Sequence, residues 1–158
     1  MTDRPPMIGS ATEHAQAVGK GDLRAVAAAL GKVLGLQRLG VNHETLPPGC
    51  RSSFPHAHSH EEEFVFVIKG CPDLWIDGSL HRLQPGDAAA FPSGTGIAHS
   101  LINNSQEEVQ FLVVGEVNAE DRVAYPVNPE IEPRRPWIDA PHRTLGPHDG
   151  KPIGPSEA

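Results

Sequence analysis

The chain has 158 residues, which suits one ordinary domain with a buried core and leaves little room for a second. Its 13 basic and 20 acidic side chains give a net charge of −7 without a run of Lys and Arg, so we expect neither nucleic acid nor a membrane as partner. Two cysteines are too few for a disulfide framework, and we see no apolar run long enough to cross a membrane and no signal peptide. We therefore expect a cytoplasmic protein.

Residues 1–31 form the first predicted segment, which is polar until it reaches the stretch GDLRAVAAALG. In that stretch Asp22 suits the N-cap of a helix, a run of Ala, Leu and Val suits its body, and Gly31 suits its end. We predict one short N-terminal helix there.

Residues 32–118 look like a succession of short strands separated by turns rich in Gly, Pro, Asn and Asp. Close, regular spacing of such strands is typical of an antiparallel sandwich or barrel, so the predicted fold class is all-β. The expected strands cover residues 33–46, 52–58, 63–70, 73–77, 79–84, 87–92, 98–103 and 108–116.

Residues 119–158 differ, because eight of the sixteen prolines lie between Pro126 and Pro155. A segment so rich in proline can be neither a regular helix nor a central strand. We expect an extended C-terminal segment that docks in part through its apolar side chains, which are Tyr125, Ile131, Trp137, Ile138 and Leu145.

Ligand-type side chains gather in the stretch SSFPHAHSHEEEFVFVIKG. His56 and His58 are two residues apart on a predicted strand, so their imidazoles leave the same face. Glu63 begins the next strand, and His99 begins a later one. Three imidazoles and one carboxylate suit a divalent first-row metal such as Mn, Fe, Ni, Co or Zn, with positions left for water or substrate.

These residues resemble the two motifs of the cupin superfamily. Gly49, His56, His58, Glu63 and Gly70 follow the first motif, and Gly86, Pro92, Gly94, His99 and Asn103 follow the second. One extra residue precedes His56, and Gly94 lies two residues further from His99 than usual, although Gly96 restores that gap. The spacing to Gly70 selects Glu63 rather than Glu62.

The resemblance implies a small antiparallel double-stranded β-helix, the jelly-roll or cupin barrel, over residues 32–118. It also implies that His56, His58, Glu63 and His99 bind one divalent transition metal per chain. We expect Glu63 to be the catalytic residue as well.

The other histidines and glutamates of the chain lack motif support. His60 falls in the loop between the two ligand strands, where solvent exposure is the simpler interpretation, and Glu61 and Glu62 suit a solvated turn. Entry into the site by His142 or His148 depends on how the C-terminal segment folds. We interpret four histidines as surface or loop residues, namely His43, His81, His142 and His148.

The strand that begins at Glu63 is apolar on both faces. If Glu63 points inward, then Phe64, Phe66 and Ile68 point outward, where they need a cover. A second copy of the chain, as in many cupins, or the 125–146 segment could supply it, and we favour a homodimer.

Several activities fit such a metal site, since a fold does not choose among them. An isomerase or epimerase of a sugar or sugar phosphate is our first hypothesis, with Arg38 and Arg51 as candidate phosphate-binding groups. A metal-dependent dioxygenase is the second, supported by the apolar Ala88–Phe91 run. A non-catalytic module that binds a small ligand is the third.

Overall fold

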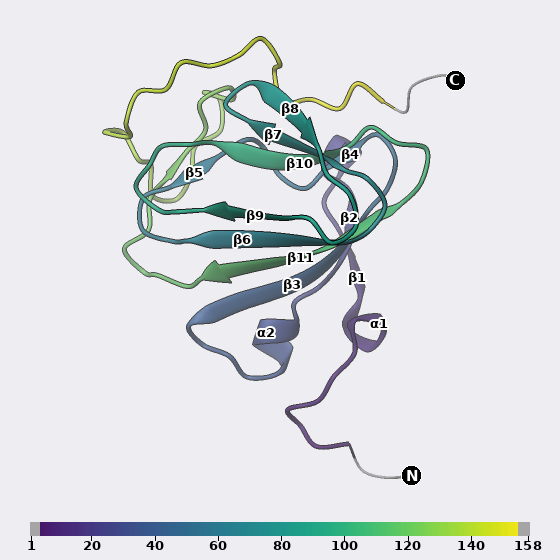
Figure 1. The fold of residues 1–158 in the computed structure, drawn as a ribbon. Helices are drawn as coiled ribbons and strands as arrows, with labels where there is room; N and C mark the ends of the chain where they lie inside the picture. The colour runs from purple at the N-terminus through teal and green to yellow at the C-terminus, as the bar shows by residue number, and fades with distance from the viewer. Residues whose placement is uncertain (1–3, 155–158) are drawn as a thin grey trace.

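The computed structural model describes residues 4–154, and its centre is a β-barrel made of two antiparallel sheets (Figure 1). The larger sheet has the strand order β1-β2-β3-β11-β6-β9 and the smaller one β4-β10-β7-β8. A third, two-stranded sheet pairs β12 with β5 beside the barrel. Antiparallel strands in two facing layers are the architecture of a jelly roll. The predicted all-β cupin-type fold is therefore confirmed.

The strands are β1 (Gln16–Val18), β2 (Ala25–Ala28), β3 (Leu39–Leu46), β4 (Cys50–Arg51), β5 (Ala57–His58), β6 (Glu63–Lys69), β7 (Asp73–Ile76), β8 (Ser79–Arg82), β9 (Ala88–Phe91), β10 (His99–Asn103), β11 (Val109–Glu116) and β12 (Val123–Ala124). The helices in the described residues are short: α1 (Ala11–His14), the 3-10 turn η1 (Gly21–Leu23) and α2 (Leu30–Val33). None of them is long and apolar enough to cross a membrane.

The helix predicted over the GDLRAVAAALG stretch is wrong. Its centre is β2, which pairs with β3 in the register Val26↔Thr45 and extends the larger sheet. Ala25 and Ala28 are buried there, so tertiary pairing outweighs the helix propensity of alanine. Asp22 is not a helix cap either, because it lies inside η1, whose N-cap is Lys20, and its carboxylate forms an ion pair with Arg51 at 3.0 Å.

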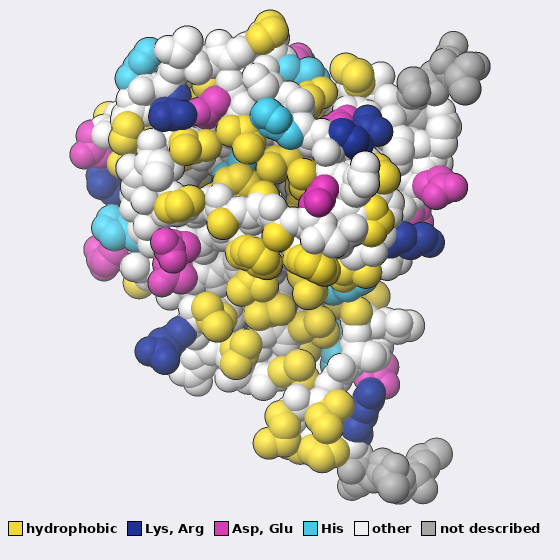
Figure 2. Space-filling model, in the orientation of Figure 1, with side chains coloured by type: hydrophobic (Ala, Val, Ile, Leu, Met, Phe, Trp, Pro, Cys, Tyr) yellow, Lys and Arg dark blue, Asp and Glu magenta, His cyan; other side chains and the backbone are white. Residues whose placement is uncertain are grey.

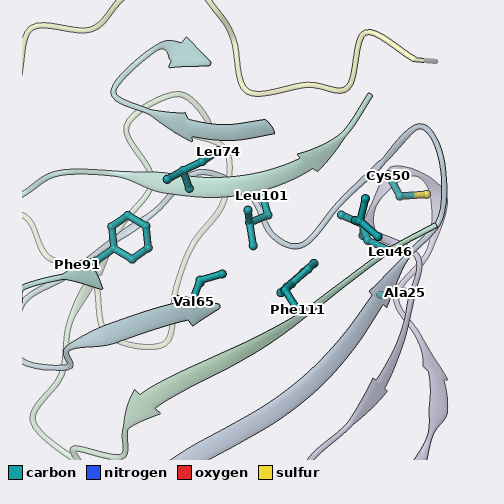
Figure 3. Close-up of a cluster of buried hydrophobic side chains, with 9 residues drawn as sticks. Ala25, Leu46, Cys50, Val65, Leu74, Phe91, Leu101 and Phe111 are labelled. Carbon is teal, nitrogen blue, oxygen red and sulfur yellow. The ribbon is translucent and has the colours of Figure 1, made fainter. Parts of the chain in front are cut away.

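The main core lies between the two sheets (Figure 3). Val65 and Phe111 point up from the larger sheet toward Leu74 and Leu101 of the smaller one, and Phe91 closes one end. Val65 lies two residues from Glu63 on the same face of β6, so the strand that builds the core also directs Glu63 into the barrel.

The C-terminal segment passes over the outer side of the smaller sheet (Figure 1), and in residues 125–154 it contains neither helix nor strand. Trp137 packs with Trp75 and Ile102 in a second apolar cluster. The indole Nε1 of Trp75 donates a hydrogen bond to the carbonyl of His148 at 2.9 Å. Gly150, at φ 79°, lies so close to Pro55 that a Cβ there would meet its Cγ at 2.4 Å.

The outer face of β6 keeps its apolar side chains in solvent. Phe64, Phe66 and Ile68 are 42%, 38% and 41% exposed, and the C-terminal segment packs on the other sheet instead of covering them. Figure 2 shows hydrophobic side chains gathered over the region of β6, β11 and β3.

Candidate metal centre

The four ligand-type residues meet at one end of the barrel. Glu63 is the first residue of β6, His58 the last of β5 and His99 the first of β10. His56 joins His99 through an isolated bridge in which each backbone N–H donates to the other's carbonyl, at 3.2 and 3.0 Å. Opposite Glu63 stands Gly115, whose missing side chain leaves room, since a Cβ there would approach Glu63 Cγ to 3.3 Å.

The imidazoles converge on a single carboxylate oxygen. Glu63 Oε2 lies 2.7 Å from His99 Nε2, 3.4 Å from His58 Nε2 and 3.5 Å from His56 Nε2. Their side chains are only 7–18% exposed. The structure therefore brings all four sequence-predicted residues together.

The second nitrogens of two rings are held by oxygen acceptors. His56 Nδ1 lies 2.9 Å from the carbonyl of Phe54, and His58 Nδ1 lies 2.6 Å from Asp121 Oδ2. Such partners hold the hydrogen on Nδ1 and leave the Nε2 lone pair for a metal. His99 stacks on Phe91 with centroids 3.6 Å apart, and its buried Nδ1 has no hydrogen-bond partner among the described residues.

Asp121 is a residue that sequence reasoning missed. Its Oδ2 binds His58, and its Oδ1 accepts backbone N–H groups of His60 at 2.8 Å and Glu61 at 3.1 Å. It thereby ties the loop between the ligand strands to the C-terminal segment. No motif marks this position, because it lies outside the motif region and reaches the site only through the pairing of β12 with β5.

The charges of the site favour an ionised Glu63. Burial would raise the pKa of Glu63, but hydrogen bonds from the three histidines hold it well below its usual range. Burial would lower the pKa of His58, whereas its contacts with Glu63 and Asp121 raise it to about 9. Burial outweighs the Glu63 contact for His99 and lowers its pKa.

A second carboxylate, that of Glu44, shares the cavity with this group. The cavity has a volume of about 80 Å³ and is bounded by Glu44, Glu63, His56 and His99 on its polar side. Burial, followed by the charge of Glu63, raises the pKa of Glu44 to about 7. The sequence offered a signal for it: Glu44 lies two residues before the buried Leu46, on the same face of β3. The rest of the lining is Ser52, Ser53, Val65, Leu74, Phe91, Leu101 and Val113.

The two arginines expected to bind substrate are not brought to this cavity. Arg51 is buried, with Asp22 at 3.0 Å, the carbonyl of Gly150 at 2.8 Å and Phe54 beneath its guanidinium. It connects the N-terminal and C-terminal segments to β4. Arg38 lines a separate depression beside Leu39 and Glu116.

The remaining histidines and glutamates have other surroundings. His60 is exposed and bonds through Nδ1 to Ser59 Oγ at 2.7 Å. Glu61 lies 3.7 Å from His58 Nδ1, outside the central cavity. His148 Nδ1 accepts the backbone N–H of Gly150 at 3.0 Å, and His142 lines a groove formed by the C-terminal segment.

Within residues 4–154, two clusters of ligand atoms could hold a metal ion. His56, His58 and Glu63 offer atoms within 4.8 Å of one another, and so do His58, Glu61 and Asp121. His99 Nε2, at 2.7 Å from Glu63, adds a further nitrogen to the first cluster. Imidazole nitrogens with one carboxylate are the donors that divalent first-row metals accept, so the first cluster fits such an ion.

Comparisons with known proteins agree with this fold. Residues 42–115 match the family model described as the cupin domain. A candidate sugar phosphate isomerase of Acidithiobacillus ferrooxidans is 29% identical, with 77% of this chain and 81% of that chain covered and a TM-score of 0.71. A sugar phosphate isomerase from Silicibacter pomeroyi, described as coming from a cupin superfamily, is 33% identical over 72% of this chain and 78% of that one, with a TM-score of 0.66.

A polyketide cyclase of Streptomyces resistomycificus is 20% identical over 87% of this chain and 91% of that chain, with a TM-score of 0.63. At that identity the likeness shows the fold alone. Comparison with curated protein sequences gives no match.

Proposed function

The chain belongs to the cupin superfamily, and on this premise we propose that it is a metal-dependent isomerase or epimerase of a sugar phosphate. His56, His58, Glu63 and His99 would hold one divalent metal. Two structural relatives, one described as a candidate sugar phosphate isomerase and one as a sugar phosphate isomerase, support the substrate class. The choice of reaction rests on the cavity itself.

The observation that carries the proposal is the pair of carboxylates in one cavity. Glu63 has a lowered pKa and stays ionised, as a ligand must, whereas the pKa of Glu44 is raised to about 7. Two carboxyl groups whose pKa values are shifted in opposite directions can take different roles at neutral pH. One stays charged, and the other accepts and returns a proton. We therefore assign the proton transfer to Glu44 and the ligand role to Glu63.

A bound divalent metal would polarise the substrate's carbonyl and adjacent hydroxyl and so acidify the C–H bond of the carbon that bears the hydroxyl. Glu44 then accepts the proton from that carbon and returns it to the neighbouring carbon, while the hydroxyl proton passes to the former carbonyl oxygen. No oxidant or reductant is consumed. Val65, Leu74 and Phe91 form part of the apolar lining beside the two carboxylates.

Solvent isotope incorporation tests the proposal. Protein loaded with Zn or Mn is incubated in D₂O with a panel of hexose and pentose phosphates, and carbon-bound deuterium is followed by NMR. We expect incorporation next to the carbonyl with wild type and its loss in Glu44→Gln, with metal content unchanged. Glu132→Gln, an exposed carboxylate, is the matched control. Absence of exchange with every sugar phosphate would overturn the isomerase proposal.

The apolar lining favours a second candidate, a metal-dependent dioxygenase. Five of the eleven residues around the cavity are aliphatic or aromatic, namely Val65, Leu74, Phe91, Leu101 and Val113. Oxygen consumption by iron-loaded protein with aromatic diols, measured with an oxygen electrode beside the isotope assay, distinguishes the dioxygenase from the isomerase. Oxygen uptake without deuterium exchange supports the dioxygenase. If neither oxygen uptake nor deuterium exchange is seen, a non-catalytic module that binds a small ligand is favoured.

We also propose that the protein acts as a homodimer. Phe64, Phe66 and Ile68 leave an apolar strip on β6 that a second copy would cover, and burying it contributes roughly 5 kcal/mol per strand before ordering costs. Sedimentation equilibrium at micromolar concentration should give the mass of two chains. A single-chain mass for wild type contradicts the dimer.

A further inference from the structure

A cleft of about 540 Å³ lies where the loop after β5 meets the C-terminal segment. Its lining is His60, Glu120, Arg122, Arg134, Arg135 and Pro136. Three of the chain's 13 basic residues thus gather in a protein whose net charge is −7. Figure 2 shows basic, acidic and histidine side chains beside one another along this side of the molecule.

The arginines of the cleft are available to an anion. Arg122 pairs with Asp139 at 2.8 Å and Arg135 with Glu120 at 3.7 Å, but all four side chains are at least 40% exposed. Exposed ion pairs contribute little, so a phosphate can displace these carboxylates. Arg134 is exposed and makes no hydrogen bond or ion pair with any residue in 4–154.

The backbone places the cleft next to the candidate metal ligand His58. Val123 pairs with His58 in the β12–β5 sheet, and Arg122 lies one residue earlier. The backbone N–H of Arg122 donates to Ser59 Oγ at 2.7 Å, and the N–H of Ser59 donates to the carbonyl of Arg122 at 2.9 Å. His60, which lines the cleft, is two residues after His58 in the chain.

We infer that this cleft is the anion subsite that binds the phosphate of the substrate, with Arg134 as its principal group. The inference rests on the proposed function, because a sugar phosphate carries its phosphate at the end of the carbon chain away from the carbonyl. On this inference, the carbonyl end of the substrate would face Glu63 and its carbon chain would extend past His58 toward the cleft. The guanidinium fork binds two phosphate oxygens at once, which an ammonium does not.

Arg38 and Arg51 do not fill this role in the same way. Arg51 is already bound by a carboxylate, a carbonyl and an aromatic ring. Arg38 is a single basic residue beside Glu116 in its depression, whereas three arginines line the cleft.

Calorimetry on the Zn-loaded protein tests the subsite, with inorganic phosphate as the first probe and the panel of hexose and pentose phosphates, beside their free sugars, as the second. We expect Arg134→Gln/Arg135→Gln to weaken phosphate binding about tenfold to a hundredfold, as loss of charge-assisted hydrogen bonds does. Arg134→Lys should weaken phosphate binding several-fold, because lysine keeps the charge but lacks the forked guanidinium. Arg24→Gln is the matched control, an exposed arginine on the N-terminal segment.

The outcomes separate the subsite from the reaction. Unchanged phosphate binding in the double variant, an equal loss in Arg24→Gln, or no phosphate binding by wild type overturns the subsite. Deuterium exchange with sugar phosphates that persists unweakened in the double variant overturns the subsite and leaves the isomerase standing. Arginine-dependent phosphate binding without any exchange supports the subsite and removes the isomerase.

Discussion

The barrel end and the C-terminal segment are held in place by different means. At the barrel end, His99 and Glu63 begin strands whose register also packs the core, so their side chains are fixed by the whole sheet. The C-terminal segment, residues 119–154, is mostly extended and attached at a few points, among them Trp137 and Gly150. We infer that the two regions can be perturbed separately.

Removing two imidazoles gives the largest expected effect and acts on the barrel end alone. His56→Ala/His99→Ala should lower affinity for Zn or Mn by well over a hundredfold, since even outer hydrogen-bond partners of ligands contribute about 10–100-fold. Metal content after dialysis against a chelator measures it. His81→Ala, an exposed histidine of β8, is the control. Equal metal retention in the double variant and wild type removes the four-residue assignment.

Trp137→Ala acts on the other region. Trp137 is 8% exposed, and its loss should cost about 3 kcal/mol of unfolding free energy, at the lower end for buried aromatics. Trp137 shares its apolar cluster with Ala57 and Ala98, which are chain neighbours of the ligand histidines. If the strands hold the ligands without help from the segment, metal content should survive while the segment becomes sensitive to protease. The control is the neighbouring Ile138→Ala, at a position 90% exposed, which should change neither the unfolding free energy nor the protease sensitivity of the segment. Loss of metal together with the segment would show that the regions are not separable.

Glu44→Gln tests the cavity through pH. The pKa of Glu44 rises from 4.5 to about 7 on folding, so the stability that protonated Glu44 contributes is complete below pH 4.5 and is lost as pH rises through 7. Glutamine is neutral at every pH, so the variant keeps this stability above pH 7. The metal-free variant should therefore exceed wild type by roughly 2–3 kcal/mol above pH 7 and match it near pH 4. Denaturant titrations at several pH values measure the difference, and a constant difference contradicts the assigned pKa.

Asp121→Asn breaks the link between the two regions and should have the smallest effect of these. The amide loses the ionic bond to His58 Nδ1 but keeps the shape of the side chain. We expect metal affinity to fall about tenfold, toward the low end for a partner that orients a ligand imidazole. Asp139→Asn, at an exposed carboxylate paired with Arg122, is the control for charge. A metal affinity equal to that of wild type would show that Asp121 only shapes the loop.

The sequence predicts the first region far better than the second. The motif spacing that marks His56, His58, Glu63 and His99 can be read directly from the sequence. Strand parity then places residues two apart, such as His56 and His58, on one face. Glu44 was predictable by the same parity from Leu46 but carries no motif. Asp121 and the arginine cleft depend on how the C-terminal segment returns to β5, which no periodic pattern encodes. The helix prediction failed for the related reason that pairing with β3 decides the structure of Ala25–Ala28.

Anomalous diffraction from crystals grown with Zn or Mn tests the central claim most directly, because two neighbouring clusters compete for the ion and share His58. The account predicts one peak per chain bonded to the Nε2 atoms of His56, His58 and His99 and to the carboxylate of Glu63. A peak bonded instead to His58, Glu61 and Asp121, or no peak in crystals soaked with excess metal, would contradict it.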